Sequence, residues 1–147
     1  MTSMKEAIIC AEFARDSGGT PVGAVIVDSR TGEIIARGHN QIEKTNNPTA
    51  HAEIVAIEEA CKILNNNRLE FCDLYVTLEP CTMCAAAISY AHIRRLYFGA
   101  YDTKGGAVEN GVRFFNAQTC HHRPEVYGGI MEHETATLLK SFFQAKR

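Results

Sequence analysis

The sequence predicts an α/β fold in which one mixed β-sheet carries helices on its faces. Segments with apolar residues at helical spacing alternate with short β-rich runs along the chain, and this alternation is typical of a layered fold. Hydrophobic residues make up 46% of the 147 residues and charged residues 22%, as in ordinary globular proteins. Because the sequence shows no linker, internal repeat or low-complexity tract, we expect a single domain over residues 1–147.

The first half of the chain predicts a helix, a pair of strands and a second helix. Apolar residues at helical spacing from Met4 to Ala11 predict an opening helix that stops before Ser17. The β-rich runs 22–28 and 33–38 flank a short turn and predict a hairpin. A helix starting at Thr49 or Ala50 should follow, because the next apolar residues fall on one stripe: Ile54, Ile57, Cys61 and Leu64.

The second half predicts three more strands separated by helices. The largely apolar run 73–78 suits a central strand that is buried on both faces. A helix of small residues is expected over 82–91, then strands at 94–99 and 125–127 and a final helix over 132–146. The stretch 108–115 has no clear period, and its place in the order α-β-β-α-β-α-β-α-β-α is that of a helix.

The charge of the chain excludes a surface uniformly covered by positive side chains. Fifteen Lys and Arg against seventeen Asp and Glu give a net charge of −2. Residues 1–90 hold seven basic and twelve acidic side chains, whereas residues 91–147 hold eight basic and five acidic ones. An anionic partner would therefore meet the last third of the chain.

The cysteines and the hydropathy point to a reducing, aqueous compartment. The six cysteines are an even number, but the chain is long for a disulfide framework and shows no secretory leader. We therefore expect reduced thiols and a cytoplasmic protein. No stretch approaches the roughly 18 apolar residues of a membrane span, so we expect no association with a membrane.

Two short segments carry the residues that point to chemistry, His51-Ala52-Glu53 and Pro80-Cys81-Thr82-Met83-Cys84. Cysteines three apart lie on the same side of a first helical turn, where the helix dipole and free N–H groups favour the thiolate. An imidazole from His51 would complete a set of three zinc ligands, and zinc with three protein ligands keeps a position open for water. We therefore predict one catalytic zinc ion per chain, with Glu53 as the proton carrier.

Glu53 can serve that metal only under one condition. Residues two apart on an ideal helix point about 200° away from each other, so His51 and Glu53 converge only if the metal lies beyond the end of the helix. The expected helix start at Thr49 or Ala50 meets this condition.

Each of these residues also has a plainer interpretation. A Cys-x-x-Cys pair alone is often a structural zinc knuckle or a redox pair. A structural zinc site needs a fourth protein ligand, but Cys72 stands at the other end of a strand, about 27 Å from Cys81 if the chain is fully extended. A lone histidine is more often a satisfied polar residue, and Glu53 alone would suit a helix start. The conjunction of the residues favours the catalytic site.

The two segments resemble the signature H-x-E…P-C-x-x-C of the zinc nucleobase deaminases, in which the glutamate is the general acid and base and not a ligand. The chain is also similar to the bacterial tRNA-specific adenosine deaminases over nearly its whole length. The motif pair is highly specific for the superfamily. The flanking stretches narrow the resemblance to the tRNA-specific members of that superfamily. These stretches are 22–25, 38–40, 48–53, 74–84 and 103–107, with Phe142 and Phe143 near the C-terminus.

This resemblance implies a fold, a reaction and partners. The fold would be a three-layer sandwich of the cytidine deaminase type, with a five-stranded mixed sheet flanked by helices. The enzyme would be a homodimer that converts the wobble adenosine of a tRNA anticodon stem-loop to inosine, with zinc and no organic cofactor. His51, Cys81 and Cys84 would bind the zinc ion. Glu53 would protonate a ring nitrogen and then the leaving amine, while hydroxide attacks C6 of the adenine.

The resemblance also implies contacts with the substrate. Asn40 would hydrogen-bond the bound nucleotide, and Asp102 would contact it from the loop after the strand at 94–99. Asn40 could equally be a turn residue at a strand end, and Asp102 a helix cap or a solvated loop acid. Basic residues would contact tRNA phosphates, although a solvated face is the commoner role of any single one. The candidates are Arg94, Arg95, Lys104, Arg113, Arg123, Lys146 and Arg147.

Two features near the C-terminus allow more than one interpretation. Phe142 and Phe143 could stack on bases, but we expect at least one of them to face the core, because adjacent aromatic side chains point in different directions. The stretch 120–124 departs from the family pattern. Its Cys120, His121 and His122 could form a second metal site, although paired surface histidines are usually solvated.

Two other functions are compatible with the sequence. A small-molecule deaminase that acts on guanine, cytosine or a pyrimidine nucleotide can carry the same zinc motif, but a free base has no use for the positive last third of the chain. A noncatalytic binding module stabilised by zinc would need four protein ligands, and it would tolerate the replacement of Glu53 by Gln.

Overall fold

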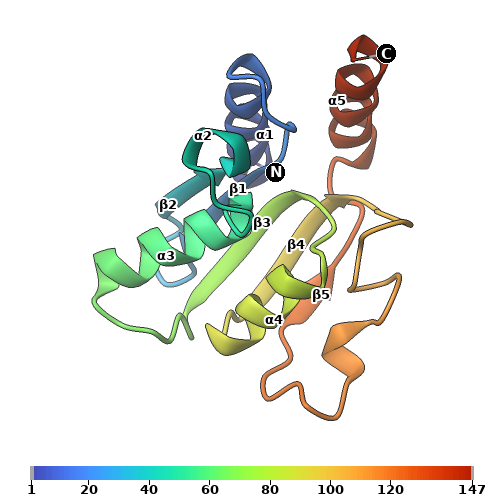
Figure 1. The fold of residues 1–147 in the computed structure, drawn as a ribbon. Coiled ribbons are helices and arrows are strands. Elements are labelled where there is room, and N and C mark those ends of the chain that lie inside the picture. The colour runs from blue at the N-terminus through green and yellow to red at the C-terminus, as the bar shows by residue number, and fades with distance from the viewer. Residues whose placement is uncertain (1, 147) are drawn as a thin grey trace.

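The computed structural model describes residues 2–146 (Figure 1). In chain order the elements are α1 (Thr2–Asp16), β1 (Gly23–Asp28), β2 (Ile34–His39), α2 (Ile42–Thr45), α3 (Ala52–Leu64), β3 (Cys72–Leu78), α4 (Thr82–Tyr90), β4 (Arg95–Ala100), the 3₁₀ helix η1 (Phe114–Asn116), β5 (Glu125–Tyr127) and α5 (Glu132–Ala145). None of these helices, within the described residues, combines the length and the apolar character that crossing a membrane requires.

The strands form one mixed, five-stranded sheet in the order β2-β1-β3-β4-β5. β1 runs antiparallel to both β2 and β3, whereas β3, β4 and β5 run parallel to one another. Parallel neighbours need a crossover connection, and α4 supplies the one between β3 and β4. The C-terminal ends of β3 and β4 therefore meet at one edge of the sheet, where the chain continues into Cys81 and Asp102 respectively.

Helices cover both faces of the sheet, which confirms the predicted three-layer sandwich (Figure 1). On one face, Ala24 and Ile26 of β1 belong to the core that α3 and α4 cover. The alternate residues Val25 and Val27 point to the other face and pack against α1. β1 is buried throughout, and β3 is nearly so, as predicted for the run 73–78.

β2 and α3 are in direct backbone contact at Gly38. A Cβ atom at this position would lie 2.3 Å from the carbonyl oxygen of Ala52 and 2.8 Å from the backbone nitrogen of Ala56. Because only glycine permits this approach, Gly38 sets how closely the start of α3 lies against the sheet. The position of His51, just before α3, depends on this contact.

Two segments differ from the prediction. The stretch 108–115 lies within the described residues and forms no α-helix there, apart from the start of the short η1. Its backbone N–H groups at Val108, Glu109 and Asn110 bond the Glu79 carboxylate instead, and this arrangement replaces helical hydrogen bonds. The helix α2 was not predicted, since four residues are too few to show a helical period.

Candidate metal centre and active site

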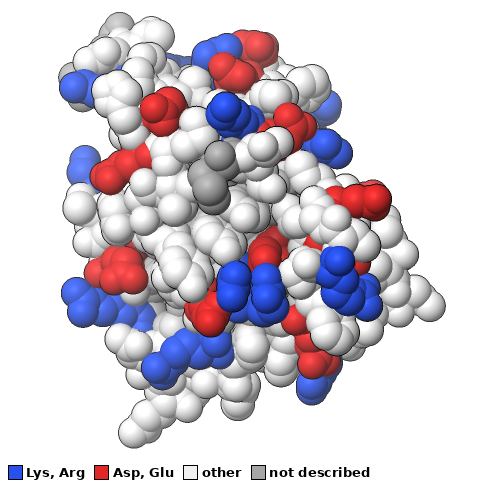
Figure 2. Space-filling view, turned by 180° about the vertical axis from the view of Figure 1, so that it is seen from behind, with Lys and Arg blue, Asp and Glu red and all other residues white. Residues whose placement is uncertain are grey.

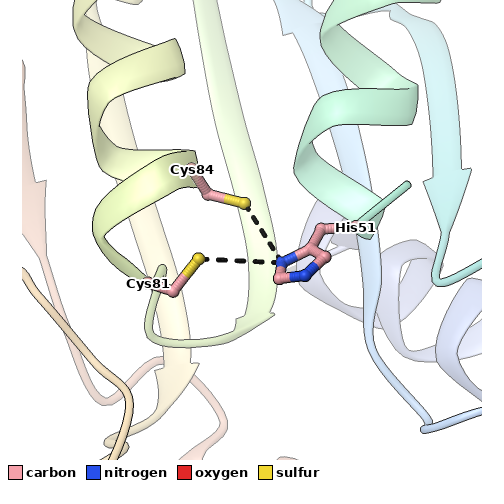
Figure 3. A group of neighbouring side chains, drawn as sticks. All are labelled: His51, Cys81 and Cys84. Carbon is pink, nitrogen blue, oxygen red and sulfur yellow. Dashed lines mark hydrogen bonds between the residues drawn. The ribbon is translucent and has the colours of Figure 1, made fainter. Parts of the chain in front are cut away.

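The start of α4 brings two cysteines to the C-terminal edge of the parallel strands (Figure 3). β3 ends at Leu78, and three residues later Cys81 forms the N-cap of α4 with extended backbone angles. Cys84 lies in the first turn of the helix, so both sulfur atoms face the same side, as the spacing predicts. Pro80 stands just before the cap, where its missing N–H costs no helical hydrogen bond.

The start of α3 brings His51 to the same place from the other side (Figure 3). The predicted start at Thr49 or Ala50 is wrong, because α3 begins at Ala52 with His51 as its N-cap residue. A turn delays the helix: the side-chain oxygen of Asn47 accepts hydrogen bonds from the backbone N–H and the hydroxyl of Thr49. Since His51 lies just outside the helix, its ring reaches a point beyond the helix end.

The three ligand atoms have the spacing of a zinc site. His51 Nδ1 lies 3.5 Å from Cys84 Sγ and 3.7 Å from Cys81 Sγ (Figure 3). Tetrahedral zinc, with Zn–N near 2.0–2.1 Å and Zn–S near 2.3 Å, separates a nitrogen and a sulfur ligand by about 3.6 Å. These side chains therefore fit one zinc ion. In the part of the chain that the structure describes, no other group of three such residues, and none with Cys72, lies close enough to hold a metal.

Hydrogen bonds at the helix start favour a thiolate on Cys81. The Cys84 thiol donates to Cys81, and together with the backbone N–H groups of Cys84 and Met83 it lowers the pKa of Cys81 to about 5, against the effect of burial. The pKa of Cys84 is raised in turn, because its thiol donates to Cys81 and is buried. Binding of a metal ion would release the proton held between the two sulfur atoms.

The carboxyl group of Glu53 is buried beside the ligands. The residue is 4% exposed, and its side chain contacts the thiol of Cys84. Burial raises the pKa of Glu53 to about 7. A carboxyl group that titrates near neutral pH can both accept and donate a proton, as general acid and base catalysis requires.

A pocket of about 210 Å³ opens beside His51 and Glu53. Its apolar lining includes Val22, Ile42 and Leu78, and Asn40 lines it as well. The side-chain oxygen of Asn40 is buried and has no hydrogen-bond partner within residues 2–146. A buried oxygen without a donor costs about 1–3 kcal/mol, so this atom is suited to accept a hydrogen bond from a ligand.

Asp102 lines the same pocket, but its carboxylate also holds a turn of the backbone. Oδ1 of Asp102 accepts hydrogen bonds from the backbone N–H groups of Lys104 and Gly105. Oδ1 of Asp102 therefore has the structural role of a loop acid. Because Asp102 also lines the pocket, the residue is within reach of a bound ligand.

Glu79 is a candidate that the sequence analysis missed. The residue is 2% exposed, and it lines the pocket. Burial raises the pKa of Glu79, but the N–H donors of Asp102, Asn110 and Glu109 outweigh this effect, and the pKa is lowered overall. Glu79 stands between a buried strand and the Pro-Cys motif, where a charged residue needs partners. This position in the sequence could have indicated that Glu79 has a role at the site.

Two of the candidate phosphate contacts lie far from the site. Arg94 and Arg95 stand at the start of β4, whereas Cys81 follows the ends of the parallel strands, at the opposite edge of the sheet. Arg94 forms a two-pronged ion pair with Asp73, and Arg95 pairs with Glu125. These two arginines hold the sheet edge and are not part of the pocket.

The other basic candidates are scattered. Lys104 lines a second hollow next to the pocket, and the ammonium group of Lys146 lies 5.0 Å from the centre of the Phe142 ring. Arg113 donates to a backbone oxygen of its own loop, Arg123 is exposed, and Arg147 lies outside the described residues. Figure 2 shows positive and negative side chains interspersed over the face turned away from the viewer in Figure 1.

The remaining candidates near the C-terminus are the two phenylalanines of α5 and the stretch that begins at Cys120. Neither Phe142 nor Phe143 is buried, so the expectation that one of them faces the core is wrong; α5 extends past the sheet, and Phe143 is 52% exposed. Cys120 donates to the backbone oxygen of His122, whose ring N–H donates to the backbone oxygen of Ile93. These groups hold the loop before β5 in place.

The family of this chain follows from its similarity to known proteins. Residues 1–100 match the family model for the zinc-binding region of cytidine and deoxycytidylate deaminases. A tRNA-specific adenosine deaminase of Agrobacterium fabrum is 56% identical over 144 residues, which cover 98% of this chain and 93% of the relative. The chain belongs to the tRNA-specific adenosine deaminase family.

Solved structures agree with this deaminase fold. One, from a study of A-to-I editing by tRNA:A34 deaminases at the wobble position of transfer RNA, has a TM-score of 0.91 and 55% identity, covering 94% of this deaminase and 99% of that chain. A guanine deaminase of Bacillus subtilis has a TM-score of 0.64 and 33% identity, covering 99% and 92%. The predicted resemblance and the predicted fold class are both confirmed.

Proposed function

We propose that this deaminase hydrolyses the wobble adenosine of a tRNA anticodon to inosine, with one zinc ion per chain. The observation that carries the proposal is a cluster of three zinc-type ligands, of which His51 and Cys81 line the same pocket as the buried carboxyl group of Glu53. The identity of 56% to a tRNA-specific adenosine deaminase supports the choice of substrate. A noncatalytic zinc module would need a fourth protein ligand, and the cluster in the described residues contains three.

The reaction consumes water and adenosine and releases inosine and ammonia. A zinc ion held by three side chains supplies Lewis acidity and makes hydroxide available near neutral pH. His51, Cys81 and Cys84 would hold this ion. Glu53 accepts a proton from the attacking water and gives it to a ring nitrogen of the adenine. It then takes the proton of the new hydroxyl group on C6, which becomes the carbonyl of inosine, and passes that proton to the amine, which leaves C6 as ammonia. Its burial and its raised pKa suit both directions of transfer.

Asn40 and Asp102 are proposed to bind the nucleotide. The side-chain oxygen of Asn40, which has no partner in the described part of the chain, accepts a hydrogen bond from the substrate. Val22 and Leu78 are apolar parts of the pocket lining, and a base in the pocket would contact them. Asp102 contacts the nucleotide from the loop after β4 and lines both the pocket and a second hollow beside it.

The shape of the surface favours an RNA loop over a free base. The pocket continues into the second hollow, of about 820 Å³, which shares Leu78 and Asp102 with it and extends to Lys104 and Phe143. A free base needs the pocket alone, whereas a nucleotide within a loop brings neighbours that need room beside it. An anticodon loop also presents bases that are already out of a helical stack, which lowers the cost of placing one in the pocket.

The proposal extends to the assembly and the location of the protein. We propose that residues 1–147 act as one deaminase domain, that two chains form a homodimer, and that the enzyme works in the cytoplasm without an organic cofactor. The six cysteines, all in the described part of the chain, are free, as suits a reducing compartment. Light scattering of the zinc-loaded protein tests the dimer through its mass.

A side-by-side deamination assay tests the function. The zinc-loaded protein is given an anticodon stem-loop RNA with adenosine at the wobble position, the same RNA with that adenosine moved into the stem, and free guanine, cytosine and adenosine. We expect inosine in the first RNA alone. Turnover of a free base without turnover of the RNA would contradict the proposal and assign a small-molecule substrate instead.

A further inference from the structure

One buried carboxylate has no part in the proposed chemistry, yet it contacts the pocket wall. Glu79 Oε2 accepts hydrogen bonds from the backbone N–H groups of Val108, Glu109 and Asn110, at 3.1, 2.8 and 3.0 Å. Glu79 Oε1 accepts from the backbone N–H of Asp102 at 3.0 Å and from the side-chain amide of Asn110 at 2.7 Å. Both ends of the segment 102–110 are therefore bonded to one side chain.

The loop fits closely around this carboxylate. A Cβ atom at Gly106 would lie 2.6 Å from Cδ of Glu79 and 2.5 Å from the carbonyl oxygen of Asp102, so no larger residue fits between them. The next residue, Ala107, donates its N–H to the carbonyl oxygen of Pro80. The segment thus surrounds Glu79 and also contacts the chain just before Cys81.

The same loop carries residues of the substrate pocket. Asp102 and Gly105 line both the pocket and the second hollow, and Lys104 lines the second hollow. The described segment 102–110 contains no helix or strand to fix its shape. Hydrogen bonds to an ionised acceptor are about twice as strong as neutral ones. The Glu79 carboxylate is therefore the main group that holds the loop 102–110 against the pocket.

We propose that Glu79 is a positioning residue, whose carboxylate holds the loop 102–110 so that Asp102 stands at the pocket in the place that nucleotide binding requires. This inference rests on the proposed function for its effect on substrate. The hydrogen bonds that tether the loop to Glu79, called the tether below, can be tested without any substrate. A role in folding alone would lower the stability of the protein but would leave the kinetics of the folded, zinc-loaded enzyme unchanged.

Glu79→Gln is the most informative variant, because the amide matches the carboxylate in size. Whichever oxygen becomes NH₂ then faces N–H donors, so one end of the loop loses its acceptor. Glu79→Asp keeps the charge on a shorter side chain, and Asn110→Ala removes one donor. Glu109→Gln is the matched control, since it neutralises an exposed carboxylate on the same loop and leaves the backbone N–H of residue 109 in place.

Steady-state kinetics on the stem-loop RNA measure the effect on substrate. For zinc-loaded Glu79→Gln we expect KM to rise by about tenfold or more, as for the loss of a hydrogen bond to a charged group, with kcat changed less than about threefold. The zinc content should stay at one per chain. Asn110→Ala and Glu79→Asp should show smaller rises in KM, and Glu109→Gln none. An unchanged KM in Glu79→Gln, or a parallel loss of zinc and kcat, would overturn the proposal.

Hydrogen exchange of backbone amides tests the tether separately. In Glu79→Gln, the amides of Asp102, Val108, Glu109 and Asn110 should exchange faster than in the parent protein, while amides of β1 and β3 keep their protection. Unchanged exchange in the loop would overturn the tether whatever the kinetics show. If the parent protein leaves the stem-loop RNA unaltered, the proposed function is wrong, and the exchange data still decide whether Glu79 holds the loop.

Discussion

At the scale of single residues, the site combines groups whose ordinary properties are changed by burial. Glu53 titrates near neutral pH because it is buried, and Asn40 keeps a buried oxygen that has no partner among residues 2–146. Both arrangements cost stability in the free protein. Such costs are expected at a site that is completed by its ligand, since the ligand supplies the missing contact.

The oxygen of Asn40 leads to a prediction that separates binding from folding. Asn40→Ala should raise KM for the stem-loop RNA by about tenfold, because a hydrogen bond to the substrate is lost. The free energy of unfolding should stay within about 1 kcal/mol of the parent value, since the substitution removes an unsatisfied buried atom. Enzyme kinetics and urea unfolding measure the two quantities. Asn67→Ala, on the exposed surface, is the control, and a normal KM for Asn40→Ala would contradict the assignment.

Sequence and structure agree best for residues whose chemistry depends on short spacing. The set His51, Cys81 and Cys84 follows from two motifs, and the folded chain places their ligand atoms at zinc-like distances. The role of Glu79 was not predictable in this way. Its partners lie 23 to 31 residues further along the chain, and four of its five donors are backbone N–H groups, which every sequence contains.

At the scale of secondary structure, the two helix starts matter most for the site. His51 and Cys81 are N-cap residues of α3 and α4, so their side chains leave the helices at the edge of the sheet. The position of α4 on the sheet follows from its crossover between parallel strands. The position of α3 depends on a close contact with Gly38 of β2.

Gly38→Ala tests whether the close contact with Gly38 fixes the position of α3. The added methyl group would meet the backbone of α3 at 2.3 Å, so the helix or the strand must move. We expect a loss of about 1–3 kcal/mol in the free energy of unfolding, as for other overpacked positions, measured by urea denaturation. Gly19→Ala is the control, since its nearest neighbours would lie 3.5 Å away. Equal stability of the two variants would show that the contact does not constrain the helix.

The elements with strong patterns were predictable, and those held by distant contacts were not. The apolar run that became β3 and the small residues of α4 carry their own signal. The loop 102–110 takes its shape from the carboxylate of Glu79, and the four-residue α2 is too short for a period. The late start of α3 depends on a hydrogen bond that the Thr49 hydroxyl donates to the side-chain oxygen of Asn47, which spacing alone does not show.

At the scale of the whole molecule, the three candidate zinc ligands come from separate parts of the fold. His51 belongs to the start of α3, while Cys81 and Cys84 belong to the connection from β3 into α4. A zinc ion held by these residues would therefore link two helices that cover the same face of the sheet. Because an unfolded chain does not preserve this arrangement, zinc binding should stabilise the folded protein.

Removal of zinc with a chelator should lower both activity and thermal stability. A ligand at a thousand times its Kd stabilises the folded state by about 4 kcal/mol, so Tm should fall by several degrees and recover when zinc is restored. Differential scanning calorimetry and a deamination assay on the same samples measure the two effects. A Tm that does not respond to removal and restoration of zinc would contradict a metal centre at these three residues.

The central claim is that Glu53 moves protons at this metal centre without being a ligand, and Glu53→Ala tests it most directly. Zinc content and inosine formation in the stem-loop RNA are measured on the same preparation, beside Glu58→Ala on the exposed surface of α3 as the control. We predict one zinc ion per chain in both variants, with turnover lost by at least about a hundredfold in Glu53→Ala and unchanged in Glu58→Ala. Retained turnover, or loss of zinc in Glu53→Ala, would contradict the account.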